Sequence, residues 1–199
     1  MSNIKTIASY FDNLAAHWPE DEKDACIRDR IIQRACLSPG NSILDIGCGK
    51  GVMVPHLLKT APKEIIELDV SKEMIRLGRE RFSLPQITHI CGDIFTVPLP
   101  SIDAAVVFNA YPHLMDKQAL AKRLHRLLND QGIVIIAHSK GKEFINAIHH
   151  DDGLCEEISI PLKTPLKEFE VFSSFFSLED WQDTSDLYYM KLKKNNNTL

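Results

Sequence analysis

One ten-residue stretch constrains the fold of this chain more than any other. It spans Ile43–Val52 and reads ILDIGCGKGV. An apolar run typical of a buried strand leads directly into three alternating glycines, Gly47, Gly49 and Gly51. Glycine accepts a positive φ and lets a ligand approach the backbone, and the start of a helix directs unpaired N–H groups at that ligand. The stretch therefore predicts a strand–turn–helix unit that binds a ligand at the end of the strand.

The chain after residue 36 alternates short apolar runs with longer amphipathic ones, which is typical of strand–helix–strand units and a mostly parallel sheet. The expected strands are Ser42–Ile46, Glu64–Asp69, Gln86–Cys91, Ile102–Asn109, Gly132–His138, Leu178–Asp183 and Leu187–Leu192. The expected helices are Val52–Lys59, Lys72–Phe82, Asp116–Asn129, Lys142–His149 and Leu166–Phe175. Only a few residues join the last two strands, which predicts an antiparallel hairpin. The expected fold class is α/β: a doubly wound, mostly parallel seven-stranded sheet with an antiparallel C-terminal hairpin.

The expected domain organisation is simple, because 199 residues suit one α/β domain. We assign residues 1–194 to this domain. Residues 1–36 carry apolar side chains at helical spacing and predict an N-terminal helical cap. Residues 153–166 contain two prolines, interrupt the alternating pattern and are expected to cover a substrate. The polar residues 195–199 are expected to be a disordered tail.

Composition limits the partners and the compartment that we expect. The formal net charge of -4 argues against a large contact with nucleic acid, which requires a basic face. We find neither an apolar run of about 20 residues nor a basic leader before a long apolar stretch, so we expect no membrane span and no secretory signal. The five cysteines are scattered without a CxxC pair, which predicts neither a disulfide framework nor a structural zinc site. These observations favour a cytoplasmic protein that acts on a small molecule.

Three carboxylates stand at the carboxyl ends of three consecutive expected strands. Asp45 precedes the first glycine by two residues, where it would repel a pyrophosphate and attract an α-ammonium group; alternatively it only caps the turn. Asp69 can accept hydrogen bonds from both hydroxyls of a ribose, or instead cap the next helix. Asp93 can accept a hydrogen bond from an adenine amino group, with the apolar face of Ile94 against the ring. Open α/β sheets bind ligands at this edge, so we expect the carboxylates to share one site.

The spacing of the glycines separates two kinds of nucleotide-binding protein. The turn has the pattern GxGxG, whereas the dinucleotide fingerprint is GxGxxG. Together with Asp45, this spacing disfavours a dinucleotide-dependent oxidoreductase.

With these motifs the sequence resembles the class I S-adenosylmethionine-dependent methyltransferases, in particular the branch with quinone-biosynthesis-like methyltransferase domains. The matching text, in the family's order, is LDIGCGKG, ELDVSKEMI, CGDI, IDAAVVFNAYPHL and LHRLLNDQGIVIIAHS. The resemblance implies a Rossmann-like fold, S-adenosylmethionine as cofactor, and a helix over YFDNLAAHW that closes over it. It also implies transfer of a methyl group to a small-molecule acceptor, with release of S-adenosylhomocysteine.

The resemblance further implies which residues bind the cofactor. They are Asp45, Gly47, Cys48, Gly49 and Gly51 at the methionine end, Asp69 at the ribose, Val70, Met74, Asp93 and Ile94 at the adenine, and Asn109 near the methionine or the acceptor. Three places depart from the family's pattern: Lys50 replaces a small residue, Glu67 replaces a glycine, and Asp130-Gln-Gly132 replaces Pro-Gly-Gly. We expect Glu67 to crowd or charge the adenine side.

Tyr111, His113 and His138 are the candidate catalytic residues. The ends of the fourth and fifth strands bring the two histidines to the same rim, and His149 is expected within reach. Histidine titrates near neutrality and also binds metals, so the histidines form a general base or, as the alternative, hold a metal. We expect no metal. Tyr111 would be a donor or a pocket wall. The competing interpretation is that the histidines are hydrogen-bonded structural residues.

Three other functions share parts of this sequence pattern. A protein that binds S-adenosylmethionine without catalysis would have the same cofactor residues and lack a productive acceptor pocket. A dinucleotide-dependent oxidoreductase would share the glycine turn. An enzyme that moves a different alkyl group from a related sulfonium donor would be separated only by product analysis.

Overall fold

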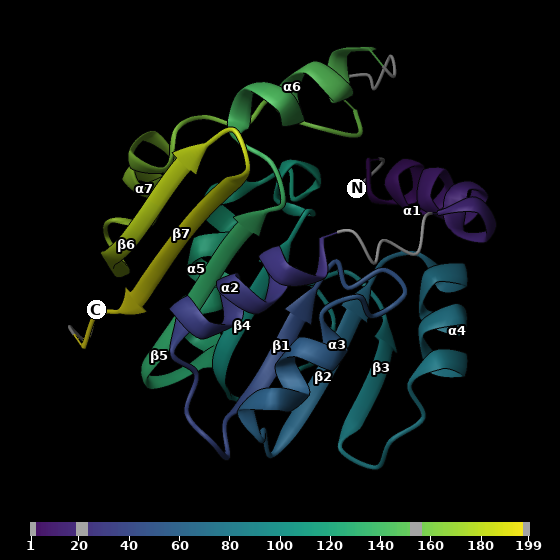
Figure 1. The fold of residues 1–199 in the computed structure, drawn as a ribbon, viewed down its shortest axis with the longest axis horizontal. Helices are drawn as coiled ribbons and strands as arrows, with labels where there is room; N and C mark the ends of the chain where they lie inside the picture. The colour runs from purple at the N-terminus through teal and green to yellow at the C-terminus, as the bar shows by residue number, and fades with distance from the viewer. Residues whose placement is uncertain (1–2, 19–23, 152–156, 197–199) are drawn as a thin grey trace.

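The structure, a computed structural model, describes residues 3–18, 24–151 and 157–196. Its centre is one seven-stranded sheet with the strand order β3-β2-β1-β4-β5-β7-β6 (Figure 1). The strands are β1 (Ser42–Ile46), β2 (Glu64–Asp69), β3 (Ile87–Cys91), β4 (Ile102–Phe108), β5 (Leu128–His138), β6 (Phe176–Thr184) and β7 (Leu187–Lys194). The first five strands pair in parallel, and β7 runs antiparallel to both β5 and β6. The predicted sheet and its C-terminal hairpin are confirmed.

Helices cover both faces of the sheet. They are α1 (Asn3–Leu14), α2 (Ala25–Ala35), α3 (Val54–Leu57), α4 (Lys72–Arg81), α5 (Lys117–Leu127), α6 (Lys142–Asp151) and α7 (Pro165–Phe172), with short 3-10 helices η1 (Ala15–His17), η2 (Leu58–Thr60) and η3 (Tyr111–His113). In Figure 1, α2 and α3 lie in front of the sheet and α5 lies behind it. Within the described ranges, no helix has the length and apolar character that crossing a membrane requires.

The alternation of side chains along β1 divides the core into two layers. Leu44 and Ile46 belong to the layer that contains the apolar side chains of α5 and α7, and Ile43 belongs to the layer under α2 and α3. Asp45 has the same parity as Ile43, so it projects toward this second layer. A carboxylate is thereby placed at the end of an apolar strand that is buried along its whole length.

Strand order also fixes where a ligand can bind. The chain builds β1, β2 and β3 outward in one direction, and then crosses to place β4 on the other side of β1. In doubly wound sheets the crevice opens at this reversal, at the carboxyl ends of the strands. The glycine turn after β1 and the segment after β4 therefore face each other.

For three of the predicted helices, the structure shows why the observed bounds differ. The helix after the glycine turn spans only Val54–Leu57, because the turn geometry continues through residue 53. Helix α5 ends at Leu127 rather than Asn129, because Leu128 already pairs with Ile102 in the sheet. Helix α7 ends at Phe172 rather than Phe175, because β6 already begins at Phe176.

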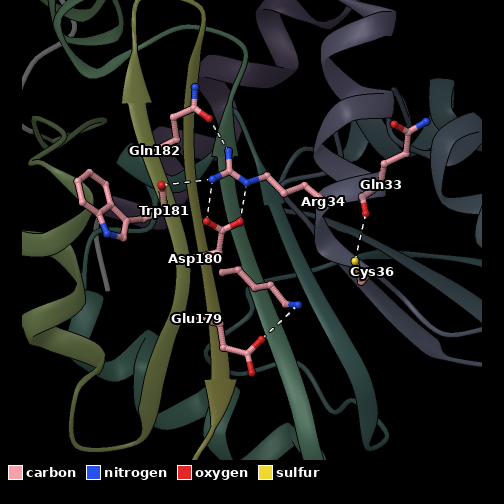
Figure 2. Close-up of polar contacts among 8 residues, drawn as sticks. Gln33, Arg34, Cys36, Glu179, Asp180, Trp181 and Gln182 are labelled. Carbon is pink, nitrogen blue, oxygen red and sulfur yellow. Dashed lines mark hydrogen bonds and ion pairs between the residues drawn. The ribbon is translucent and has the colours of Figure 1, made fainter.

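An arginine on α2 fastens this helix to the C-terminal hairpin (Figure 2). Arg34 donates to both carboxylate oxygens of Asp180, at 2.5 and 2.7 Å, and also to the side chain of Gln182. Its guanidinium lies 4.6 Å from the centre of the Tyr189 ring. A bidentate pair of this kind fixes the orientation of the two elements as well as their distance.

Two predicted segments reach beyond the described residues. Of the expected cover, residues 153–156 lie outside them, and residues 157–163 pack on η3, with Ile160 donating its N–H to Pro112 O at 3.0 Å. Of the expected disordered tail, residues 197–199 lie outside them. Asn195 donates its N–H to Phe175 O at 2.9 Å.

Candidate functional site

A cavity of about 690 Å³ opens at the carboxyl ends of β1, β2 and β4. Cavities of roughly 300–1,000 Å³ hold ligands of cofactor size. Its walls come from the glycine turn, the end of β2, the loop after β3, the segment after β4, and α1. They contain the predicted cofactor residues Gly47, Cys48, Gly49, Asp69, Val70, Met74, Asp93, Ile94 and Asn109. The structure thus brings together most residues of the predicted cofactor site.

The glycine turn lies tightly against the segment that follows β4. Gly47 has a φ of 69°, and a Cβ added there would lie 2.4 Å from the Cβ of Ala110. Its N–H donates to Leu68 O at 2.8 Å, and the N–H of Cys48 donates to the same oxygen at 3.2 Å. Glycine is therefore required at this position both by its backbone conformation and by the close approach of the neighbouring segment.

Asp69 joins the glycine turn to the start of α4. Its Oδ2 accepts a hydrogen bond from Gly49 N at 2.9 Å, and its Oδ1 accepts one from Ser71 N at 2.8 Å. Burial raises the pKa of Asp69, although both hydrogen bonds act in the opposite direction. The carboxylate lies in the cavity wall, and the lone pairs that these two bonds leave can accept hydrogen bonds from a ligand.

Asp45 and Gly51, in contrast, lie outside the cavity walls. Asp45 is 1% exposed beneath the turn, and no N–H or O–H group of the described residues donates to its carboxylate. Burial raises the pKa of Asp45 to about 7, and the nearby charge of Asp69 adds to this effect. Glu67 is 0% exposed, and a Cβ added at Gly51 would lie 3.2 Å from its Oε2. The expectation that Glu67 crowds the adenine side is wrong, because its side chain lies under the turn.

The walls of the cavity that follow β3 and β4 are held by local hydrogen bonds. Asp93 Oδ1 accepts from Phe95 N at 3.0 Å, and Ile94 is buried beside it. Asn109 has a φ of 54°, and its Oδ1 accepts from Ser139 N at 3.0 Å. Because Asn109 N also donates to Ala137 O, this residue ties the end of β4 to the end of β5.

Helix α1 forms one wall of the cavity. Asp12 Oδ1 accepts hydrogen bonds from Ser71 Oγ at 2.6 Å and from Glu73 N at 3.0 Å, which docks α1 on the start of α4. Lys50, at the glycine turn, is buried and donates from Nζ to Trp18 O at 2.8 Å. The position that departs from the family's small residue therefore connects the turn to the chain that follows α1.

Among the three catalytic candidates, His113 is the one that lies in the cavity wall. Its Nδ1 is 2.9 Å from Ile158 O, and the edge of its ring meets the Phe11 ring at 5.0 Å between centres. A carbonyl oxygen only accepts, so Nδ1 carries the proton and Nε2 is the basic nitrogen of the neutral ring. Segment 157–163 and α1 thus hold the imidazole from two sides.

Tyr111 is not a wall of the cavity. It is 0% exposed, its hydroxyl donates to Glu168 Oε2 at 2.9 Å, and burial together with the Glu168 charge raises its pKa. Lys117 donates to Tyr111 O and lies 3.6 Å from the ring centre. The predicted role of Tyr111 as a pocket wall is therefore wrong, since its ring faces the core.

His138 is also outside the cavity walls. It is 1% exposed and packs edge-on against Tyr188, with ring centres 5.8 Å apart. The side chain of His149 lies outside the described residues. In the part of the chain that the structure describes, no three His, Cys, Asp or Glu side chains gather as metal ligands would.

Sequence reasoning missed the apolar walls of the cavity. They include Ile4, Ile7, Phe11, Trp18, Val52, Phe95, Phe108, Leu114 and Met115. The helical spacing of Ile4, Ile7 and Phe11 predicts one apolar face on α1, but the sequence does not reveal what this face covers.

Comparison with known proteins agrees with this geometry. The family model described as a methyltransferase domain matches residues 44–136. The (S)-coclaurine N-methyltransferase of Thalictrum flavum subsp. glaucum is 26% identical over 79% of this chain and 45% of its own length. The malonyl-(acyl-carrier protein) O-methyltransferase of a Marinomonas species is 27% identical over 98% of this chain and 77% of its own length. The chain spans less than half the length of the first curated relatives that it matches.

A solved structure shares the fold. The N-methyltransferase NodS from Bradyrhizobium japonicum, in complex with S-adenosyl-L-homocysteine, superposes with a TM-score of 0.73 at 14% identity. The match covers 94% of this chain and 98% of that one. The quinone-biosynthesis-like branch stays a prediction. Residues 44–136 thus match a methyltransferase domain, and the seven-stranded topology is that of a solved methyltransferase.

Proposed function

We propose that this chain transfers a methyl group from S-adenosylmethionine to a small-molecule acceptor with a largely apolar body, and releases S-adenosylhomocysteine. One observation carries the proposal: a single cavity joins the glycine turn and the carboxylates after β2 and β3 to an apolar chamber under α1. A cofactor and an acceptor can meet in this cavity.

The residues of the cavity fit the cofactor. Gly49 gives its N–H to Asp69, and this carboxylate is placed to accept from the ribose hydroxyls. Asp93 offers an acceptor for the adenine amino group, while Ile94 and Met74 offer apolar surface to the ring. When bound, S-adenosylmethionine supplies an electrophilic methyl group on a positively charged sulfur.

Asp45 would act on the methionine end without touching it. It lies beneath the turn rather than in the cavity wall, but a buried charge acts through a medium of low dielectric and attracts an α-ammonium group across the turn. This role requires that Asp45 be ionised when the ligand is bound.

The acceptor chamber is mostly apolar. Ile4, Ile7, Phe11 and Met115 contribute to its walls, and Lys5 is a cationic side chain of the same wall. Such walls favour an acceptor that buries a hydrocarbon or aromatic body, since an unpaired polar group would be costly to bury. The N- and O-methyltransferases among the relatives show that this fold serves both acceptor atoms, so the walls do not determine the atom.

His113 is the candidate general base. Its protonated Nδ1 points to Ile158 O, so Nε2 is the nitrogen that accepts a proton from the acceptor atom. Orientation in line with the methyl group supplies much of the acceleration, and the base matters where the acceptor must lose a proton.

Calorimetric titration with S-adenosylmethionine, S-adenosylhomocysteine and NADH tests the cofactor. We expect both sulfur ligands to bind and NADH not to bind. At about 100 times its dissociation constant, a ligand stabilises the fold by about 2.7 kcal/mol, which thermal unfolding detects independently. Binding of NADH alone would refute the proposal.

A labelled-methyl assay tests catalysis. The chain is incubated with methyl-labelled S-adenosylmethionine and a panel of apolar amines, phenols and carboxylic acids, and label is counted in the extracted products. Transfer to at least one acceptor, dependent on His113, supports the enzyme. Tight cofactor binding without transfer to any acceptor would favour the non-catalytic alternative.

A further inference from the structure

Two buried carboxyl groups lie side by side under the glycine turn. Asp45 on β1 pairs in register with Glu67 on β2, so both side chains project from the same face of the sheet. Asp45 is 1% exposed and Glu67 is 0% exposed. None of the described residues outside the pair donates an N–H or O–H group to their four oxygens.

The described groups that face this pair provide no cation. Cys48 in the turn and Asp69 at the end of β2 are acidic or neutral, and both shift toward their protonated forms on burial. His89 follows Glu67 in register on β3, and burial and Arg79 lower its pKa, so its ring is neutral. Val106, opposite Asp45 on β4, is apolar. The buried polar side chains of α2, α3 and the turn have other partners: Arg28 donates to His56 Nε2, His56 Nδ1 contacts Asp29, and Lys50 donates to Trp18 O.

Two adjacent negative charges without donors or a counterion are too costly to bury together. The pair must therefore hold a proton between its oxygens. Burial raises the pKa of both carboxyl groups, and the charge of Asp45 raises that of Glu67 further. The pair then carries one proton and one negative charge.

We propose that Glu67 is a positioning residue: it shares one proton with Asp45, and the hydrogen bond between the two carboxyl groups holds a single negative charge beneath the turn that receives the amino group of the cofactor. This inference rests on the proposed function, because it assigns the charge that attracts the α-ammonium group. It also explains why a glutamate is accepted under Gly51, where the family commonly has glycine.

The sharing of a proton makes cofactor binding depend on pH. The pKa of Asp45 is raised to about 7, so below that pH the pair carries a second proton part of the time. The α-ammonium group of either sulfur ligand favours the ionised form, so binding expels this proton. The affinity of the wild-type chain should therefore rise with pH up to about 7, by at most about tenfold per pH unit.

Two substitutions at Glu67 separate the effect of its hydrogen bond to Asp45 from the effect of the shared proton. Glu67→Gln keeps a donor for Asp45 and removes the shared proton. Glu67→Met removes the donor and leaves an apolar side chain of similar length. Glu64→Gln is the matched control, because it removes a glutamate charge from the opposite end of β2, where Glu64 accepts from Ser42. Calorimetry with S-adenosylhomocysteine, between about pH 6 and about pH 7.5 and in buffers of different ionisation enthalpy, reports both affinity and proton release.

We expect Glu67→Gln to bind as tightly as wild type at the upper pH, to bind more tightly than wild type at the lower pH, and to release less proton. Glu67→Met should bind about tenfold more weakly, the loss of one hydrogen bond to a charged group. The Glu64→Gln control should keep the wild-type profile. If Glu67→Met does not fold, the pH dependence of ligand affinity in Glu67→Gln tests the inference alone.

Two results would overturn the inference. If Glu67→Gln binds S-adenosylhomocysteine weakly at every pH, the negative charge that attracts the α-ammonium group belongs to Glu67 itself. A wild-type pH profile in Glu67→Gln would mean that the residue only fills space. If the wild-type chain binds neither sulfur ligand, the proposed function fails instead. In that case, the free energy of unfolding of the ligand-free protein, measured against pH, still tests the shared proton. The same pH dependence in wild type and Glu67→Gln would contradict it.

Discussion

Replacing Gly47 with alanine should disrupt the cofactor site more than it disrupts the fold. The added Cβ would lie 2.4 Å from the Ala110 Cβ, whereas carbon atoms pack best at about 3.5–4.0 Å. The turn or the segment after β4 must therefore move by about 1 Å. Both form walls of the cavity, so the shift is imposed directly on the bound ligand.

The magnitude follows from two contributions. Alanine at positive φ costs about 1–2 kcal/mol, and overpacking costs about 1–3 kcal/mol more. Gly47→Ala should therefore lower the free energy of unfolding by about 2–5 kcal/mol. Gly40→Ala is the matched control, because Gly40 has a φ of 82° with nothing within 4 Å of the added Cβ. It should lose only the first contribution, about 1–2 kcal/mol.

Denaturant unfolding and calorimetric titration with S-adenosylhomocysteine make the comparison. We expect Gly47→Ala to bind at least about tenfold more weakly, which corresponds to about 1.4 kcal/mol, and Gly40→Ala to bind as wild type does. Equal affinities in the two variants would refute the assignment of this turn to the cofactor, whatever their stabilities.

Four further predictions concern the rest of the site. His113→Asn keeps a donor for Ile158 O and removes the base, so labelled-methyl transfer should fall by about 100-fold or more with cofactor affinity unchanged; full transfer would exclude His113 as the base. Asp12→Ala removes the acceptor that docks α1, so amide exchange in α1 should accelerate about tenfold, and unchanged protection would contradict the docking. Tyr111→Phe leaves a buried acceptor without its donor and should cost about 1–3 kcal/mol in denaturant unfolding while the affinity stays the same; weaker cofactor binding would return Tyr111 to the site. The raised pKa of Asp45 means that the folded state binds more protons than the unfolded state between about pH 4 and about pH 7, so this pair lowers stability as pH rises, and the slope should be smaller in Glu67→Gln.

The sheet and the cofactor walls were largely predictable from the sequence, because both depend on short-range patterns. Strand periodicity located all seven strands to within a few residues. The spacing from the glycines to Asp69 placed this carboxylate in the cavity wall, where the structure has it. In each case one strand and the turn that follows it determine the position.

The catalytic candidates were harder to predict, because their orientation depends on a short 3-10 helix. Successive residues of such a helix are rotated by about 120°, so Tyr111 and His113 must point in different directions. The sequence does not say which of them faces the cavity. The structure turns Tyr111 into the core and leaves His113 in the wall. Likewise, the apolar face of α1 was visible in the sequence, but its docking through Asp12 and Ser71 joins residues 59 positions apart.

The position of β7 between β5 and β6 has a consequence for the order in which the chain can fold during synthesis. When the ribosome has delivered the strands up to β5, the edge of β5 has no neighbour on its outer side, and Arg34 on α2 has not yet met Asp180. β6 emerges next but cannot pair with β5, because its place is beyond a strand that does not yet exist. The nascent domain therefore carries an open, apolar sheet edge until the hairpin has left the exit tunnel, and this interval is when it most needs protection from aggregation.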